Sequence, residues 1–150
     1  MATTFHNLNY HIIFSTKGRE PFIRKDLETR VWNYIGGVAR VNKCESLIIG
    51  GVENHIHALL RLPADMAVSK AVQLIKGGTS KWINDEKFMQ MRFAWQNGYG
   101  AFTVSKSNVE DVYNYIHSQR THHETRTFED EYRAFMLRHD IMFEEKHLFD

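Results

Sequence analysis

The chain has 150 residues, of which 43% are hydrophobic and 25% are charged. This length fits a single domain, and the composition is that of a folded globular protein, which excludes wholesale disorder. The longest apolar runs are far too short to cross a bilayer, and one cysteine excludes an internal disulfide. The first residues show no signal-peptide pattern. We therefore expect one cytoplasmic domain over residues 1–150.

The net charge of +1 argues against a general polyanion-binding protein, but the charges are unevenly distributed. Residues 1–123 carry 15 Lys and Arg against 10 Asp and Glu, whereas residues 124–150 carry 4 against 8. A basic body followed by an acidic segment is compatible with nucleic-acid binding. An ordinary solvated surface explains the charges equally well.

The pattern of apolar residues predicts a sheet with helices between its strands. In chain order we expect a strand at 10–16, a helix at 26–41, strands at 46–50 and 55–62, a helix at 69–84, and short strands at 92–95 and 101–105. Asp26 and Ser69 are the expected N-caps of the two helices. The β-α-β-β-α-β order predicts an α+β, ferredoxin-like (split βαβ, RRM-like) antiparallel sheet over residues 8–106, with two helices on one face.

Two more helices are expected beyond the sheet, without a linker that would mark a second domain. Ser107 and Glu110 match a capping box, which predicts a helix at 108–120. An acidic C-terminal helix is expected at about 127–143.

The helix at 108–120 has an apolar and a polar stripe. The apolar stripe consists of Val109, Val112, Tyr113 and Ile116, and the polar stripe consists of Asn108, Asp111, Tyr115, Gln119 and His122. Tyr113 is therefore expected in the core, and Tyr115 is expected to have a free hydroxyl. Tyr115 and Gln119 are four residues apart, so they are neighbours on the helix surface.

Residues 53–60 hold the most informative pattern of the chain. Because side chains alternate along a strand, His55 and His57 point to one face while Ile56 points to the other. Two imidazoles on one open face can converge on a metal ion, and the Gln119 amide oxygen is a candidate third ligand. An isolated His-x-His pair is more often structural, so the third ligand matters. His11, on the first strand, either supports the pair or packs in the core.

With these motifs in register, the sequence resembles the HUH-superfamily single-tyrosine transposases of small bacterial insertion sequences and the related REP-associated tyrosine transposases. The matching stretches are Tyr10–Lys17, His55-Ile56-His57, Ser69–Val72, Trp95–Phe102, and Tyr115–Gln119 followed by His122-His123. The resemblance as a whole covers the chain from residue 10 to about residue 143. Asn54 is a departure, since an aspartate is expected before the first histidine.

The resemblance implies metal-assisted cleavage and rejoining of single-stranded DNA through a 5′-phosphotyrosine. It implies that Tyr115 is the nucleophile and that His55, His57 and Gln119 bind Mg²⁺ or Mn²⁺. It also implies a homodimer whose active sites are completed in trans. A phenol with a pKa near 10 is a weak nucleophile at neutral pH, so a metal ion on the phosphate is a reasonable requirement.

Single-stranded or hairpin DNA is the expected partner, and basic residues of the body are the expected contacts. The candidates are Lys17, Arg19, Arg24 and Lys25 near the first loop, and Lys70, Lys76 and Lys81 along the second helix. Two other functions fit the same sequence. A non-catalytic nucleic-acid-binding module would form no covalent adduct, and a metal phosphodiesterase that uses water would turn over without a protein–DNA bond.

Overall fold

The computed structural model describes residues 2–150 and confirms the α+β, ferredoxin-like prediction. Four antiparallel strands form one sheet in the order β2-β3-β1-β4. The strands are β1 (Asn9–Ser15), β2 (Glu45–Val52), β3 (His55–Arg61) and β4 (Gly100–Val104). The two central strands, β1 and β3, are almost entirely buried because both faces of the sheet are covered.

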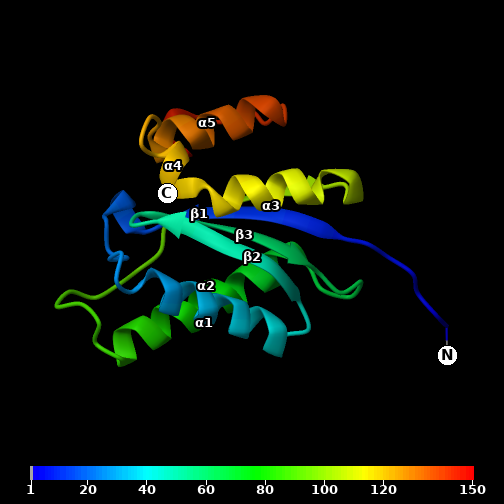
Figure 1. Cartoon of the computed structure of the whole chain (residues 1–150), viewed down its shortest axis with the longest axis horizontal. Helices are drawn as coiled ribbons and strands as arrows, with labels where there is room; N and C mark the ends of the chain where they lie inside the picture. The colour runs from blue at the N-terminus through cyan, green and yellow to red at the C-terminus, as the bar shows by residue number, and fades with distance from the viewer. Residues whose placement is uncertain (1) are drawn as a thin grey trace.

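Helices cover the two faces of the sheet separately (Figure 1). On one face lie α1 (Glu28–Val41) and α2 (Val68–Asp85). On the other lie α3 (Val109–His117), the short α4 (Gln119–His122) and α5 (Phe128–Arg138), with α5 stacked above α3 (Figure 1). Three 3₁₀ turns complete the fold: η1 (Lys17–Arg19), η2 (Lys106–Asn108) and η3 (Glu145–His147).

Alternation along the central strands builds a separate apolar layer on each face. Ile12, Phe14 and Ile56 point toward α1 and α2 and belong to the larger layer. Ile13 and Leu59 point the other way, toward α5 and α3 respectively. The polar side chains of β1 and β3 share this second face, so the candidate site lies beneath the C-terminal helices.

The prediction of a strand at 92–95 is wrong, since this segment forms only an isolated bridge between Thr16 and Trp95. Its apolar residues serve the core instead: Phe93 and Trp95 are buried and pack edge to face. The β-forming composition of the segment reflects burial of its side chains and not strand pairing.

Three of the expected helix caps are also wrong. Neither Asp26 nor Ser69 caps a helix, because the first turns begin after Leu27 and Ala67, and α3 begins after Asn108 without a capping bond from Ser107. The helix expected at 108–120 is interrupted at Ser118, which separates α3 from α4. In the described chain, no helix combines the length and apolarity that crossing a membrane requires.

Candidate metal and nucleophile site

The histidine pair lies on β3 and shares one face of the sheet, as the sequence predicts. His55 and His57 are both fully buried, whereas Ile56 points into the opposite apolar layer. The sheet face that carries them is not open to solvent, because Phe128 of α5 stacks on the His55 ring at a ring separation of 4.3 Å. The expectation of an open face is therefore wrong, because α5 covers it.

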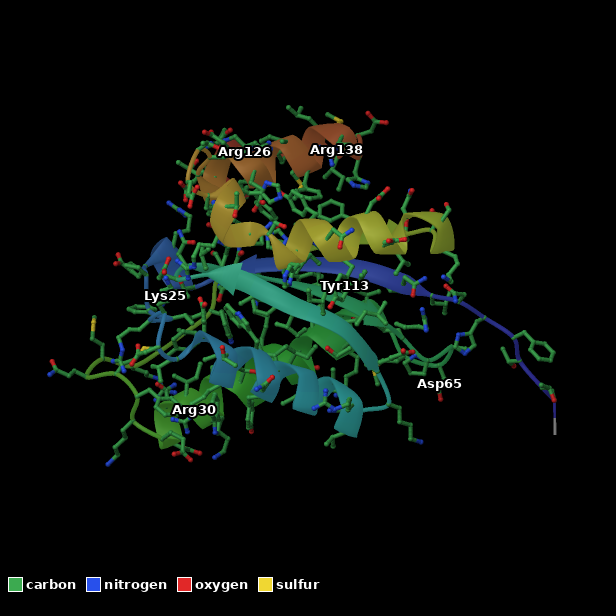
Figure 2. The ribbon with its side chains drawn as sticks, viewed as in Figure 1. Lys25, Arg30, Asp65, Tyr113, Arg126 and Arg138 are labelled. Carbon is green, nitrogen blue, oxygen red and sulfur yellow. The ribbon has the colours of Figure 1, made fainter. Side chains whose placement is uncertain are left out.

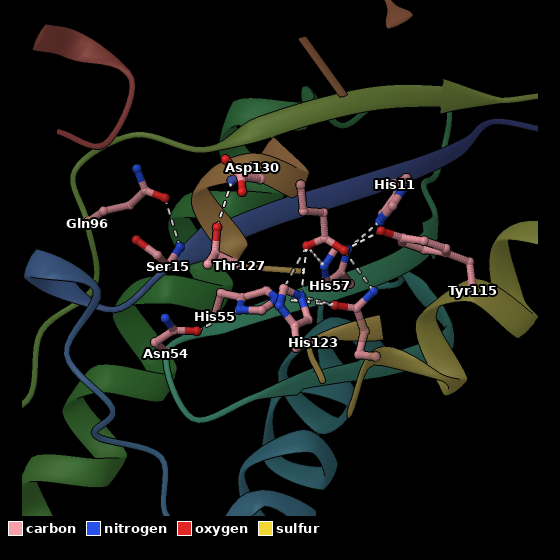
Figure 3. Close-up of polar contacts among 12 residues, drawn as sticks. His11, Ser15, Asn54, His55, His57, Gln96, Tyr115, His123, Thr127 and Asp130 are labelled. Carbon is pink, nitrogen blue, oxygen red and sulfur yellow. Dashed lines mark hydrogen bonds and ion pairs between the residues drawn. The ribbon is translucent and has the colours of Figure 1, made fainter. Parts of the chain in front are cut away.

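Neighbouring polar groups hold both imidazoles in position. His11 Nε2 and His57 Nδ1 lie 2.7 Å apart and share a hydrogen bond, so the supporting role considered for His11 matches its position. His55 Nδ1 lies 2.8 Å from the Asn54 side-chain oxygen (Figure 3). An amide oxygen can only accept, so His55 Nδ1 carries the hydrogen and Nε2 faces the site. Asn54 thus orients the ring as an aspartate would.

The interruption at Ser118 brings Gln119 inward, beneath α5. Gln119 is buried, and its Oε1 lies 3.1 Å from His55 Nε2 and 3.1 Å from His123 Nε2. The structure therefore brings together the predicted residues His55, His57 and Gln119. His123, which the sequence analysis named only within the stretch that resembles the family, is a further member of the same cluster.

The two tyrosines of α3 occupy different environments. Tyr113 is 41% exposed and stacks only on His117, so its predicted core position is wrong. Tyr115 is half-buried, with its ring stacked on His122 and edge-on to Phe135. Tyr115 is half-buried because α3 lies between the sheet and α5. The helix face that carries Tyr115 is therefore covered by α5, in addition to the face that packs on the sheet.

Glu131 of α5 is the centre of the cluster, and the sequence reasoning missed it. Its Oε1 lies 3.0 Å from His57 Nε2, 3.2 Å from His123 Nε2 and 3.4 Å from His55 Nε2. Its Oε2 accepts hydrogen bonds from the Tyr115 hydroxyl and, at 3.2 Å, from Gln119 Nε2. The available signal was an acid inside the apolar stripe of α5, which consists of Phe128, Tyr132, Phe135 and Met136.

Burial and proximity shift the pKa values of these groups. Burial lowers the pKa of His55 to about 4 and also lowers that of His11. Burial and the Glu131 charge raise the pKa of Tyr115, so its hydroxyl is protonated at neutral pH. Burial alone would raise the pKa of Glu131, but contacts with the imidazoles of His123, His55 and His57 hold it well below its usual range.

The cluster has the composition of a divalent-metal site. His55, His57 and Glu131 each offer one donor atom, and these atoms all lie within 4.8 Å of one another. Gln119 Oε1 faces the same space from α4. Two imidazoles with oxygen donors are a ligand set that manganese and other divalent transition metals accept.

A cavity borders the cluster on the side of Tyr115 and His11. A cavity of about 340 Å³ lies between α3, β4 and α5, lined by His11, Phe102, Asp111, Tyr115, Arg138 and His139, among others. Arg126 and Arg138 flank the two ends of α5, so they bring positive charge to this layer (Figure 2).

The expected DNA-contacting residues fall into two groups. Lys17, Lys25 and Lys70 are exposed, and the structure gives them no ion pair. The others are engaged: Arg19 pairs with Glu129, Arg24 with Asp26 and Lys81 with Asp85. Lys76 is half-buried and donates to the backbone carbonyls of Gln96, Asn97 and Gly98, so it has a structural role.

Known proteins with similar sequences are transposases. Residues 4–119 match the family model described as "Transposase IS200 like". The transposase for insertion sequence element IS200 of Salmonella typhimurium is 29% identical over 125 residues, which cover 79% of this chain and 81% of the relative. The ISDra2 transposase TnpA of Deinococcus radiodurans is 22% identical over 119 residues, covering 76% of this chain and 85% of that protein.

Solved structures share the fold at lower sequence identity. A structure of a REP-associated tyrosine transposase bound to a REP hairpin has a TM-score of 0.60 and 15% identity, covering 82% of this chain and 74% of that one. A Deinococcus radiodurans protein assigned as a transposase has a TM-score of 0.65 and 19% identity, covering 79% of this chain and 95% of that one.

Proposed function

The chain belongs to the IS200-like transposase family, and we propose that it cuts and rejoins single-stranded DNA through a covalent tyrosine intermediate. The observation that carries the proposal is the position of Tyr115. Its hydroxyl contacts the same Glu131 carboxylate that contacts His57 Nε2 (Figure 3). The Tyr115 hydroxyl and the His57 nitrogen thus contact the same carboxylate, so the proposed nucleophile lies close to the proposed metal donors. Phosphoryl transfer requires this proximity.

Tyr115 is the proposed nucleophile. Its phenolic oxygen attacks the scissile phosphorus, the bond to the 3′ oxygen breaks, and that oxygen leaves as a 3′-hydroxyl after taking up a proton. The 5′-phosphotyrosine retains the energy of the phosphodiester, so the reverse attack by a 3′-hydroxyl rejoins DNA without ATP. The raised pKa of Tyr115 means that the phenol must lose a proton during attack, and Glu131 is the carboxylate that accepts its hydrogen bond.

His55, His57 and Gln119 are the proposed ligands of Mg²⁺ or Mn²⁺. The two Nε2 atoms and the Gln119 Oε1 face one space, and the opposite nitrogen of each imidazole is already engaged by Asn54 or His11. When bound, such an ion withdraws charge from the phosphate and stabilises the transition state. The imidazole ligands favour Mn²⁺ over Mg²⁺.

Single-stranded or hairpin DNA is the proposed partner. The exposed lysines Lys17, Lys25 and Lys70 are available to neutralise phosphates. A hairpin is also the ligand in the structure of the REP-associated transposase that shares this fold.

We also propose a homodimer in which Tyr115 of one chain serves the histidines of the other. Excision and rejoining require two cut ends, and one chain offers one nucleophile; closed dimers are the commonest oligomers. In the single chain, Tyr115 lies beside its own His57, at a ring separation of 5.9 Å, so trans assembly requires α3 to leave its own sheet.

Mixing Tyr115→Phe and His55→Ala chains tests the arrangement. In trans assembly, an adduct forms on the His55→Ala chain of the mixed dimer. An inactive mixture in which mass measurement confirms mixed dimers overturns trans assembly.

The experiment that tests the function is incubation of the full chain with single-stranded oligonucleotides and Mn²⁺, followed by denaturing gels. We expect a protein–DNA adduct that requires the metal and Tyr115. Cleavage without an adduct would favour the water-using phosphodiesterase. Binding without cleavage or metal dependence would favour the non-catalytic module.

A further inference from the structure

Glu131 carries a buried negative charge without a permanent cation beside it. The carboxylate is 1% exposed, and within the described chain its ion-pair partners are the imidazoles of His55, His57 and His123, with no Lys or Arg among them. A buried carboxylate is costly unless it is paired with positive charge. A cation bound beside Glu131 would therefore stabilise the buried charge.

The orientation of His55 indicates where such a cation would lie. Because Nδ1 carries the hydrogen that binds Asn54, Nε2 of the neutral ring has only a lone pair. This lone pair faces two acceptors, Gln119 Oε1 at 3.1 Å and Glu131 Oε1 at 3.4 Å. A lone pair and two acceptor oxygens converge favourably only around a positive charge, either a metal ion or a proton on the ring.

The spacing of the donors fits a metal ion. Ligands at about 2.1 Å from a divalent ion are separated by about 3.0 Å in octahedral and about 3.4 Å in tetrahedral geometry. The contacts of Glu131 Oε1 with His57 Nε2 and His55 Nε2 are 3.0 and 3.4 Å, and that of Gln119 Oε1 with His55 Nε2 is 3.1 Å. These three separations are ones that coordination requires, and the donor atoms of His55, His57 and Glu131 all lie within 4.8 Å of one another.

We infer that Glu131 of α5 is a ligand of the catalytic ion, together with His55, His57 and Gln119. The inference rests on the proposed function for the other three ligands and adds a carboxylate from the acidic C-terminal segment. Since Glu131 Oε2 also binds the Tyr115 hydroxyl, the same side chain positions the nucleophile beside the ion. The helix α5 is then part of the active site and not an appendage to the sheet domain.

Calorimetric titration of the full chain with MnCl₂ tests the inference, using Glu131→Gln as the main variant. We expect one Mn²⁺ per wild-type chain and an affinity at least about tenfold weaker in Glu131→Gln, which keeps the shape but loses the charge. Asp130→Asn is the matched control, because its side chain is exposed on the same helix; we expect its affinity to be unchanged. The Mn²⁺-induced rise in Tm should shrink in Glu131→Gln and persist in Asp130→Asn.

The outcomes separate this inference from the proposed function. If wild type and Glu131→Gln bind Mn²⁺ equally and share one circular dichroism spectrum, Glu131 is not a ligand, although the metal-dependent function stands. If the wild type binds no Mn²⁺ at pH 7.5, the positive charge beside Glu131 is a proton on the His55 ring and not a metal ion, and both proposals fail. Should Glu131→Gln not fold, Glu131→Asp retains the charge but withdraws the carboxylate by one methylene, and equal binding there overturns the inference.

Discussion

Gly50 of β2 lies directly beneath Ile116 of α3, so closely that a Cβ at position 50 would be 2.8 Å from the Ile116 carbonyl oxygen and 3.0 Å from its Cγ2. Ile116 is buried in the layer between the sheet and α3. Since Tyr115 is the preceding residue, this contact sets the distance between the proposed nucleophile and the histidines of the sheet. Glycine at position 50 therefore allows α3 to lie this close to the sheet.

Gly50→Ala should push α3 away from the sheet. We expect a loss of about 1–3 kcal/mol in the free energy of unfolding, as is usual for overpacking, together with a slower rate of adduct formation. Urea unfolding and single-turnover gels measure the two effects. Gly77→Ala is the matched control, because a Cβ there meets nothing within 4 Å in α2; it should stabilise the protein by up to about 1 kcal/mol.

Tyr115→Phe should abolish the covalent adduct, because the phenolic oxygen is the proposed attacking atom. Tyr113→Phe should retain it, because the Tyr113 ring is exposed and distant from the cluster contacts. Denaturing gels with a labelled oligonucleotide compare the two variants, and circular dichroism checks their folding. Loss of the adduct in a folded Tyr113→Phe protein alone would reverse the assignment.

Acid should destabilise the metal-free protein below about pH 6.5. Burial lowers the pKa of His55 from an ordinary value of 6.5 to about 4. Between these two pH values the unfolded chain binds a proton at His55, whereas the folded chain does not. Stability is then fully present above pH 6.5 and is lost as the pH falls toward 4; from pH 7.5 to 5 this loss is on the order of 2 kcal/mol. Urea unfolding in EDTA at several pH values measures it, and His55→Gln should show a shallower dependence.

The basic residues should divide into DNA-binding and structural groups. Lys17→Gln and Lys25→Gln should weaken binding to single-stranded DNA and reduce the slope of log K against log salt by about 0.7 each. Lys76→Met should leave the salt slope unchanged but lower the free energy of unfolding by about 1–3 kcal/mol, since three carbonyls lose their donor. Fluorescence anisotropy in a salt series and urea unfolding distinguish the groups.

The sheet, the helices α1 and α2 and the histidine pair could be predicted from the sequence, because apolar side chains recur at strand or helix spacing in each of these segments. Alternation places His55 and His57 on one face whatever covers them. Tyr113 was misplaced because amphipathicity assumes one buried face, and α3 has two. Glu131 was missed because its partners are 8 to 76 residues away in the chain, and no local pattern shows that an acid on α5 meets a strand.

The sheet divides the interior into two apolar layers, and α5 contributes to only one of them. Lifting α5 would expose Ile13 and the histidines while Ile12, Phe14 and Ile56 stay packed against α1 and α2. Opening of the site is then a local event, and amide hydrogens of α5 should exchange with solvent at a lower opening free energy than those of β1 and β3. Such an opening would admit a DNA strand to the proposed catalytic centre while most of the protein remains folded.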